Sequence, residues 1–480
     1  MQQIELRENV APRYNTEPGK LTRVQHRLSI VAMLAVVGAL FLPTLWYGLV
    51  FDDRVQIVGN YRLTSWNYFL SYFTTHLWAH LPLTKTWYRP LFLVWLRLCY
   101  VVLGPPSSKW HLASILAHLA TTWAVFALLH RLTKDFKSAI VSAALFGVHP
   151  IHIESVAWVS AVEDPLVTLF LVLAVYLYIG RSGPISPLSL LAAFLAMLTK
   201  EVGVMAAGLI FAYEWTHSSL KNAVVAVLPY LFPTTLYLAL RYHATGNLSS
   251  SQRYMSLSSM FLTWPRLLLT YLEHLMWPIH LSVMYNVAVE NRVWPLLLLI
   301  VIVAALLWRS GRAADANIRF GAAWVAITIA PALAIRYFAN DFLHDRYLYT
   351  PSVGLVLMVG AALTRMRYTQ LRLITIGVVF FALCVISASD MRIWHDDIRL
   401  LERALEYVPN STTTRSDLAV VYMEAHRNTE AERLLQEAIL LDPRAPYLYH
   451  NLSICKEQMG DHAEAIRLEA ISIELAAEQR

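Results

Sequence analysis

Charged residues are scarce in this sequence. Only 15% of its 480 residues are charged, whereas 57% are hydrophobic, and a soluble globular domain has about 25% charged residues. Several apolar runs reach about 18 residues, which is long enough to span a bilayer. These runs exclude a large soluble helical protein, and we expect a polytopic, all-α membrane protein embedded in a lipid bilayer.

Cysteine is scarce as well. Cys99, Cys384 and Cys455 are the three cysteines, too few for a disulfide framework and without metal-ligand spacing. The net charge of +6 fits basic cytoplasmic loops, and we expect no nucleic-acid partner. We also expect no cleavable signal, because the apolar run at 28–50 exceeds the about 7–15 residues of a signal peptide.

Apolar runs alternate with basic loops along the first part of the chain. Arg13, Lys20, Arg23 and Arg27 precede the first run, which predicts a cytoplasmic N-terminus. The expected spans are 28–50, 110–129, 139–148, 166–179, 188–198, 202–213, 223–240, 293–308, 320–335, 348–363 and 373–388. About eleven spans with basic inner loops place the C-terminus outside. A run at 91–103 is too short to span and predicts an interfacial or partly embedded helix.

This topology divides the chain into three parts. We expect a cytoplasmic tail at 1–27, a membrane domain at 28–389 with outer loops at 51–109 and 241–292, and an extracytoplasmic domain at 390–480. The protein would lie in a bacterial inner membrane with a periplasmic C-terminal domain, or in the membrane of the endoplasmic reticulum with a lumenal one.

The C-terminal part contains an internal repeat. Leu401, Ala404 and Pro409 recur as Leu435, Ala438 and Pro443, with Leu418, Ala419, Tyr422 and Ala431 between them. This register matches the tetratricopeptide repeat, whose period is about 34 residues. A weaker copy follows. We therefore predict a short α-solenoid that binds peptides or partner proteins.

Ionisable residues gather at span ends on one predicted face of the membrane domain. They are Asp52, Asp53 and Arg54; Arg89 with Tyr88; His149, His152 and Glu154; Glu163 and Asp164; Lys200 and Glu201; Glu273 and His274; and Asp345 and Arg346 with Tyr347. Such groups beside spans are costly and are candidates for function. Any one of them is more often a helix cap or an ion-pair partner, but the whole cluster favours a site.

A sugar donor carried on a polyprenyl phosphate matches these residue types. Its lipid lies in the bilayer, and its phosphate leaving group needs cations, for which Arg89, Lys200 and Arg346 are the candidates. The acceptor hydroxyl needs a base, either Asp52 or Asp53, and a single displacement would invert the anomeric centre. We expect the remaining residues of the site lining to be Arg54, Tyr88, His149, His152, Glu154, Glu201, Asp345 and Tyr347.

His149, His152 and Glu154 are also ligand types for zinc or manganese. Pro150 and the span boundary disfavour a helix-face ligand pair, and capping or hydrogen bonding is the more common use of such histidines. We predict no resident metal or other cofactor, and a divalent metal at these three residues is the alternative.

Motifs in a fixed order extend through the membrane domain. They are FDD at 51–53, YRPL at 88–91, HPIHIESVAWVS at 149–160, TKE at 199–201 and DRYLYTPSVG at 345–354. Together they resemble the TMTC family of transmembrane and tetratricopeptide-repeat proteins and its bacterial relatives. The resemblance covers nearly the whole chain, and the block at 149–160 is specific.

The resemblance implies a GT-C-type bundle that transfers mannose from a polyprenyl phosphate to Ser or Thr hydroxyls of proteins. It matches Asp52 and Asp53 to the catalytic first-loop motif and Arg346 to the arginine of a later motif. Asp345 stands where Glu is commoner, and Glu163-Asp164 replaces a more Arg-Glu-like pair. The repeat domain is much shorter than in the animal members of the family, which favours a bacterial relative.

Three alternatives remain at this point. The same fold could act on a lipid or polysaccharide acceptor, and a non-catalytic scaffold could present the repeats to partners. A transporter would carry charged or broken helices near the bilayer midplane and repeated spans, whereas the polar residues here lie at span ends.

Overall fold

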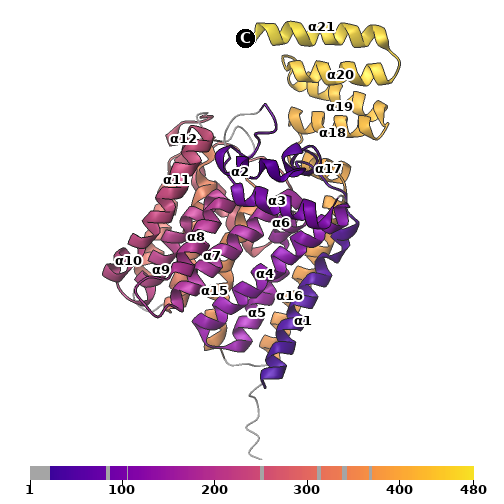
Figure 1. Cartoon of the computed structure of the whole chain (residues 1–480). Helices are drawn as coiled ribbons and strands as arrows, with labels where there is room; N and C mark the ends of the chain where they lie inside the picture. Colours follow the sequence, from indigo (N-terminus) through magenta and orange to yellow (C-terminus); the bar gives the residue numbers. More distant parts are fainter. Residues whose placement is uncertain are drawn as a thin grey trace, which may run out of the picture.

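A helical bundle carries a stack of shorter helices at one end (Figure 1). The computed structural model describes residues 22–82, 87–104, 106–248, 253–279, 281–310, 315–337, 343–366 and 370–479, without the side chains of 303–310. Most of the expected N-terminal tail, 1–21, lies outside these residues. Within the described ranges the secondary structure is helical and includes no strand, which confirms the all-α class.

The bundle and its outer loops are built from sixteen of the described α-helices. They are α1 (Arg23–Phe41), α2 (Ser71–Thr74), α3 (Pro90–Leu103), α4 (Ser107–Thr133), α5 (Phe136–Gly147), α6 (Ile153–Ala157), α7 (Glu163–Ile179), α8 (Pro187–Thr199), α9 (Ala206–His217), α10 (Leu220–Val227), α11 (Leu231–Thr245), α12 (Leu257–Met276), α13 (Trp294–Ser310), α14 (Ala316–Ile329), α15 (Tyr349–Arg365) and α16 (Gln370–Asp390). The short interfacial run expected at 91–103 is α3.

Seven helical segments in the described ranges are long and apolar enough to cross a membrane. They are Arg23–Trp46, Ser107–Thr133, Val159–Ile179, Leu220–Thr245, Ala316–Tyr337, Asp345–Arg365 and Gln370–His395. A bilayer core has no water to satisfy backbone groups, so apolar segments of this length fold as helices there. The chain is a multi-pass membrane protein.

The other four expected spans coincide with shorter helices: α5, α8 and α9 have 12 or 13 residues, too few to cross alone, and α13 has 17, at the lower limit of a span. The segment Pro150–Ala157 follows α5 at an angle of 53°, and this bent pair counts as an eighth crossing. Pro150 lacks the N–H that would continue the helix. The described residues therefore have seven or eight crossings where the sequence predicts about eleven, because apolar length alone does not separate short embedded helices from full spans.

Two glycines let α14 and α15 approach closely. A Cβ atom added at Gly354 would lie 2.4 Å from the Gly321 carbonyl oxygen, so no larger residue fits without separating the helices. Small residues at helix crossings are typical of membrane bundles. This contact fixes the start of α15, which follows the turn Asp345–Leu348.

The C-terminal stack consists of two helical hairpins preceded by a single helix. Its helices are α17 (Asp397–Tyr407), α18 (Thr412–Glu424), α19 (Asn428–Leu441), α20 (Pro446–Gln458) and α21 (His462–Glu478). Leu401, Leu418, Leu435 and Leu452 share one apolar core. The turns of both hairpins contain a residue with left-handed backbone, His426 (φ 58°) and then Gly460 (φ 85°), at corresponding places in the repeat.

Candidate functional site

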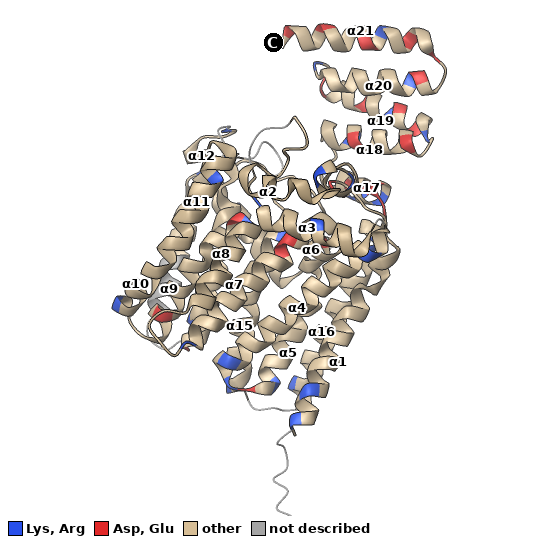
Figure 2. Cartoon of the chain, viewed as in Figure 1, with Lys and Arg blue, Asp and Glu red and all other residues tan. Residues whose placement is uncertain are grey.

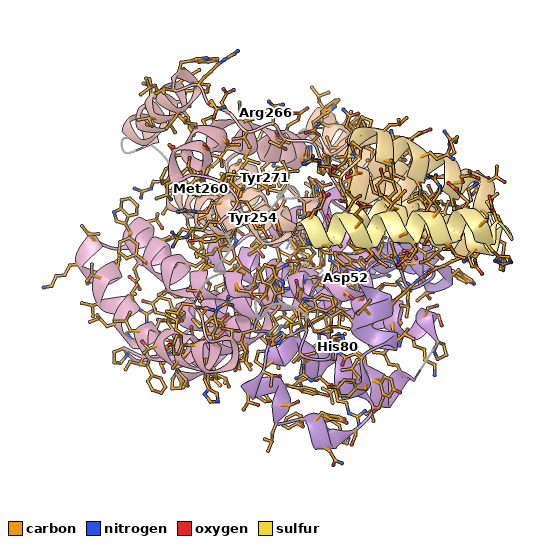
Figure 3. All side chains as sticks on the ribbon, turned by 90° about the horizontal axis from the view of Figure 1, so that it is seen from above. Asp52, His80, Tyr254, Met260, Arg266 and Tyr271 are labelled. Atoms are coloured by element: carbon orange, nitrogen blue, oxygen red, sulfur yellow. The ribbon has the colours of Figure 1, made fainter. Side chains whose placement is uncertain are left out.

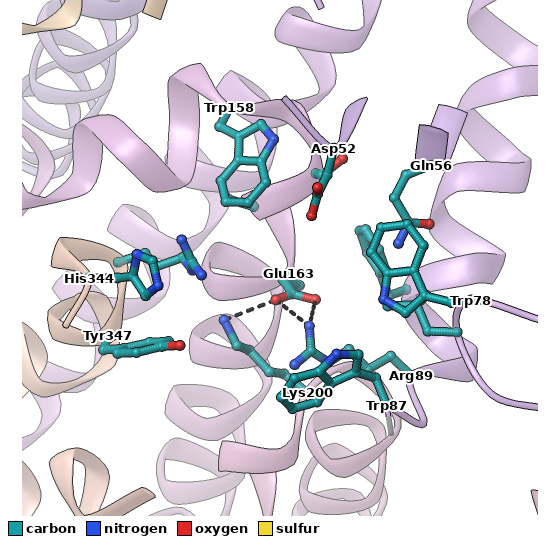
Figure 4. Close-up of a pocket in the computed structure, with 15 residues that line it drawn as sticks. Asp52, Gln56, Trp78, Trp87, Arg89, Trp158, Glu163, Lys200, His344 and Tyr347 are labelled. Atoms are coloured by element: carbon teal, nitrogen blue, oxygen red, sulfur yellow. Dashed lines mark hydrogen bonds and ion pairs between the residues drawn. The ribbon is translucent and has the colours of Figure 1, made fainter. Parts of the chain in front are cut away.

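A cavity of about 230 Å³ opens at the end of the bundle next to the C-terminal stack. We call it the polar cavity. Its lining residues are Asp52, Gln56, Leu77, Trp78, Trp87, Arg89, Phe92, Trp158, Ser160, Ala161, Glu163, Lys200, His344, Arg346 and Tyr347. These residues come from six separate stretches of the chain (Figure 4). The fold thus brings together polar residues from several span ends, which the sequence predicted to lie on one face of the membrane domain.

Asp52 occupies a tight turn at one wall of the polar cavity. The preceding residue, Phe51, has left-handed backbone with φ 55°, a conformation that costs a bulky residue energy. Asp52 is half-buried, and its carboxylate faces Glu163 across the cavity in Figure 4. Burial raises the pKa of Asp52, Arg346 opposes this effect and Glu163 adds to it. A carboxylate with a raised pKa is a better proton acceptor.

Asp53 lies behind this wall and does not line the polar cavity. Its side chain is fully buried and accepts hydrogen bonds from the backbone N–H groups of Ser160 (2.7 Å) and Val50 (3.3 Å). Burial raises the pKa of Asp53 to about 7, although these donors oppose the change. Its carboxylate therefore fixes the turn to the segment that begins α7.

Three cations line the polar cavity, and each is held by carboxylates. Arg89 pairs with Glu163 at 2.7 Å and Glu201 at 2.8 Å, and Lys200 pairs with Glu163 at 3.0 Å. Arg346 is paired with Glu154. Arg89, Lys200 and Arg346 face only two lining carboxylates, Asp52 and Glu163. Counted with the carboxylates that pair with them from behind, Glu154, Asp164 and Glu201, these cations give no net positive charge, but their N–H groups are the donors that a phosphate group needs.

The neighbouring carboxylates keep these cations charged despite burial. Burial alone would lower the pKa of Lys200, but Asp164 (2.5 Å) and Glu163 outweigh it and raise that pKa. In the same way burial would raise the pKa of Glu201, yet Arg89 and Arg241 hold it at about 2. At neutral pH the network consists of charged pairs.

Aromatic side chains form the remaining walls. Arg89 lies over the Trp87 ring at 4.9 Å, and Arg346 lies between Trp158 at 5.0 Å and Tyr347 at 5.2 Å. Mixed aromatic walls with few, converging polar groups are typical of small-ligand sites. The faces of these rings suit the apolar face of a sugar ring.

A second, more apolar cavity of about 140 Å³ adjoins the first. The two share Trp87, Arg89, Lys200 and Tyr347, and the second adds Val202, Pro331 and Ala332 among others. Pro331 and Ala332 belong to the membrane-spanning segment Ala316–Tyr337. We call this the apolar cavity. The cations thus lie between a polar space and an apolar one.

Several residues predicted to line the site instead support it from behind. None of them lines the polar cavity. Three of them form hydrogen bonds elsewhere: His149 donates to the Leu275 carbonyl oxygen at 3.1 Å, His152 bonds to Ser352 at 3.0 Å, and the Tyr88 hydroxyl donates to the Phe73 carbonyl oxygen at 2.9 Å. Two carboxylates pair with the cations of the site, Glu154 with Arg346 and Glu201 with Arg89. Asp345 bonds to His274 and Tyr285. Arg54 turns away toward α17 and α18.

The alternative metal ligands are not assembled. No group of three or more His, Cys, Asp or Glu side chains suited to a metal occurs in the ranges that the structure describes. His149 and His152 make the separate hydrogen bonds given above, and Glu154 is paired with Arg346. These side chains already have partners that a metal would need to displace.

Glu163, Trp158 and His344 line the polar cavity but were not predicted as lining residues. Glu163 was placed in the polar cluster, yet an acidic residue at the start of an apolar helix resembles an ordinary N-terminal charge. Trp158 lies within the HPIHIESVAWVS block, and that motif was the available signal. His344 directly precedes the DRYLYTPSVG motif at 345–354, and that neighbourhood was its only signal.

Comparisons with known proteins now bear on this geometry. A tetratricopeptide-repeat family model matches residues 398–450, which confirms the predicted repeat. Protein O-mannosyl-transferase TMTC3 of Mus musculus is 30% identical over 207 residues, 41% of this chain and 22% of that protein. A protein O-mannosyl-transferase of Caenorhabditis elegans is 24% identical over 444 residues, 87% of this chain and 62% of that protein. The chain is similar to proteins named as TMTC protein O-mannosyl-transferases.

The resemblance of the sequence motifs to the TMTC family is thereby confirmed. The match spans about a fifth of the TMTC3 proteins of mouse and human, 22% and 21% respectively. Among solved structures, this chain is similar to ArnT from Cupriavidus metallidurans bound to undecaprenyl phosphate. That likeness has 17% identity and a TM-score of 0.42, and it covers 93% of this chain and 77% of ArnT.

Proposed function

We propose that this protein is a GT-C-type glycosyltransferase that moves a sugar from a polyprenyl phosphate to an acceptor hydroxyl with inversion. One observation carries the proposal. A half-buried carboxylate, Asp52, shares a small cavity with three cations and five aromatic side chains at the end of a membrane bundle. Such a transfer needs a base for the acceptor hydroxyl, cations for the phosphate and side chains that contact the sugar ring.

In this mechanism Asp52 is the base. It accepts the proton of the acceptor hydroxyl while that oxygen forms a bond to the anomeric carbon. The bond from the anomeric carbon to the phosphate oxygen breaks, and its electron pair stays on the phosphate. Arg89, Lys200 and Arg346 stabilise the charge that develops there. One displacement from the opposite side inverts the anomeric centre.

The two cavities suggest how the donor is placed. The polar cavity holds the sugar among Trp78, Trp87 and Trp158, and the apolar cavity holds the first part of the lipid. The phosphate then lies near Arg89 and Lys200, which line both cavities. This arrangement allows the lipid to remain in the bilayer while its headgroup reacts at the membrane surface.

The finer assignments are part of the same proposal. The names of the relatives favour mannose as the sugar and proteins as acceptors, the resemblance of the motifs adds Ser or Thr hydroxyls, and the repeats supply a surface for such proteins. Lys and Arg at the end remote from the repeats (Figure 2) favour a cytoplasmic N-terminus and an extracytoplasmic domain from residue 390. The membrane is the bacterial inner membrane, or that of the endoplasmic reticulum.

The test is transfer of radiolabelled mannose from synthetic polyprenyl-phosphate-mannose to a membrane extract by the purified full chain. Asp52→Asn should reduce transfer by about 100-fold or more, because it removes the base. Asp396→Asn is the matched control, since Asn can also cap α17 and this residue does not line either cavity.

Protease treatment of the product identifies the acceptor. Label that becomes soluble after proteolysis supports a protein acceptor, and label that resists it indicates a lipid or polysaccharide. Lanes with chelator test the metal alternative. If the wild type transfers nothing from mannose or from any other polyprenyl-phosphate sugar, the enzyme proposal is wrong and the scaffold alternative takes its place.

A further inference from the structure

One carboxylate of the C-terminal stack binds both ends of the acidic turn. Asp397, the first residue of α17, accepts a hydrogen bond from the Phe51 backbone N–H at 2.7 Å. Its other oxygen forms an ion pair with Arg54 at 2.6 Å. Asp52 and Asp53 lie between these two anchored residues. The side chain of Asp397 is only 7% exposed, so solvent competes little for either bond.

The turn needs such an anchor. Phe51 has the left-handed backbone described above, and its N–H is one of the groups that fix this conformation. Its ring packs edge-on against Trp158 at 5.6 Å, and Trp158 stacks on Trp394 at 6.1 Å. Trp394 lies just before α17. Phe51, which precedes Asp52, is therefore bound to Asp397 through its N–H and, through Trp158, packed toward Trp394 by its ring.

Two further contacts join the same surfaces. The Gly48 N–H donates to the His395 carbonyl oxygen at 3.1 Å. Arg54 also pairs with Glu424, at the end of α18, at 2.5 Å. Seen from above, Asp52 lies beside the repeat helices (Figure 3). Residues 51 and 54 thus tie the turn to α17 and α18, and residue 48 ties it to the segment just before α17.

We propose that Asp397 is a positioning residue for the reaction, through which the repeat domain orients the Asp52 carboxylate. This inference rests on the proposed function. It makes the repeat domain a structural part of the active site as well as a docking surface for the acceptor. Asp397 does not line either cavity, so it acts through the backbone of the turn and through Arg54.

The kinetic test compares Asp397→Ala, Asp397→Asn and the control Asp396→Asn in the full chain. Asp397→Ala should lower kcat by about 10- to 100-fold and leave the KM for polyprenyl-phosphate-mannose within about twofold, because a small displacement of a reacting group is costly. Asp397→Asn should recover part of the loss, since its amide oxygen still accepts the Phe51 N–H. Asp396→Asn should match the wild type.

Two kinetic results would overturn the inference. One is an unchanged kcat in Asp397→Ala. The other is a fall in kcat with a parallel rise in KM and a lowered thermal midpoint in detergent, which would mean general loosening of the fold. The partial rescue by Asp397→Asn separates a lost hydrogen bond from an unfolded domain.

Hydrogen–deuterium exchange gives a readout that does not depend on activity. Peptides covering residues 48–58 should exchange faster in Asp397→Ala than in the wild type, and Asp396→Asn should leave them unchanged. Unchanged exchange in Asp397→Ala contradicts the inference whatever the kinetics. If the wild type transfers no sugar but exchange rises as expected, the proposed function fails while the clamp on the turn stands.

Discussion

Asp52 and Asp53 are adjacent in sequence but have different surroundings. Asp52 shares the polar cavity with Glu163, and Asp53 accepts backbone hydrogen bonds from Ser160 and Val50. Two carboxylates in different environments can take different roles. We therefore assign the base to Asp52 and give Asp53 the task of holding the turn.

The charge of Glu163 should control the pH dependence of the reaction. Glu163 raises the pKa of Asp52, in addition to the larger effect of burial. Transfer requires ionised Asp52, so activity falls as the pH drops through this pKa. Glu163→Gln should move the acidic limb of kcat/KM to lower pH, even if the maximum rate also falls. A pH–rate profile measures this, and a limb at the wild-type pH would contradict the assignment of Asp52.

Asp53 should make the fold less stable as the pH rises. Its pKa in the folded state is about 7, against an ordinary value of 3.8. Between pH 3.8 and 7 the Asp53 side chain keeps a proton in the folded chain that it has lost in the unfolded chain. The stabilisation that Asp53 gives the fold is therefore complete below pH 3.8 and is lost as the pH rises through 7. The thermal midpoint should fall from pH 5 to pH 8, and less so in Asp53→Asn. Equal falls in both proteins would argue against a buried, protonated Asp53.

At the scale of elements, the contact between α14 and α15 controls the position of Arg346. Gly354→Ala would place a methyl group against the Gly321 carbonyl oxygen, and overpacking of this kind costs about 1–3 kcal/mol. The substitution should lower the thermal midpoint and raise the KM for the donor, because the turn Asp345–Leu348 directly precedes α15.

Gly377→Ala in α16 is the matched control for that substitution. No atom lies within 4 Å of the Cβ that it would add, and Ala favours a helix interior by about 1 kcal/mol over Gly. It should leave the midpoint unchanged or raise it. Equal losses in both variants would mean that the glycine contact is not what matters.

The sequence predicts the helices better than their contacts. Apolar runs of sufficient length must be helical in a bilayer, so all eleven expected spans coincide with helices, and the register of Leu401 with Leu435 predicted the repeat that the family model confirms at 398–450. The partner of Asp53 is 107 residues away and that of Phe51 is 346 residues away. Local patterns carry no information about such pairs, which is why the roles of Asp53 and Arg54 needed the fold.

At the scale of the whole molecule, the two ends of the bundle should face opposite sides of the membrane. Leu440 in α19 is 84% exposed, and Ser182 lies exposed in the loop between α7 and α8. In sealed, right-side-out membranes a membrane-impermeant maleimide should label Leu440→Cys, and should label Ser182→Cys only after permeabilisation. The native Cys99 and Cys455 are buried, and the unsubstituted chain supplies the background. The reverse pattern would invert the proposed topology.

The clamp by Asp397 also sets an order of events during synthesis. The acidic turn emerges from the ribosome early, whereas Asp397 follows Phe51 by 346 residues. At about 5–20 residues per second, this interval lasts tens of seconds. A nascent chain can insert its first spans long before Asp397, which binds Phe51 and Arg54, has been made, whereas the last span, Gln370–His395, directly precedes it. The acidic turn therefore gains this anchor only after the preceding membrane domain has been made, and products truncated before residue 397 lack it.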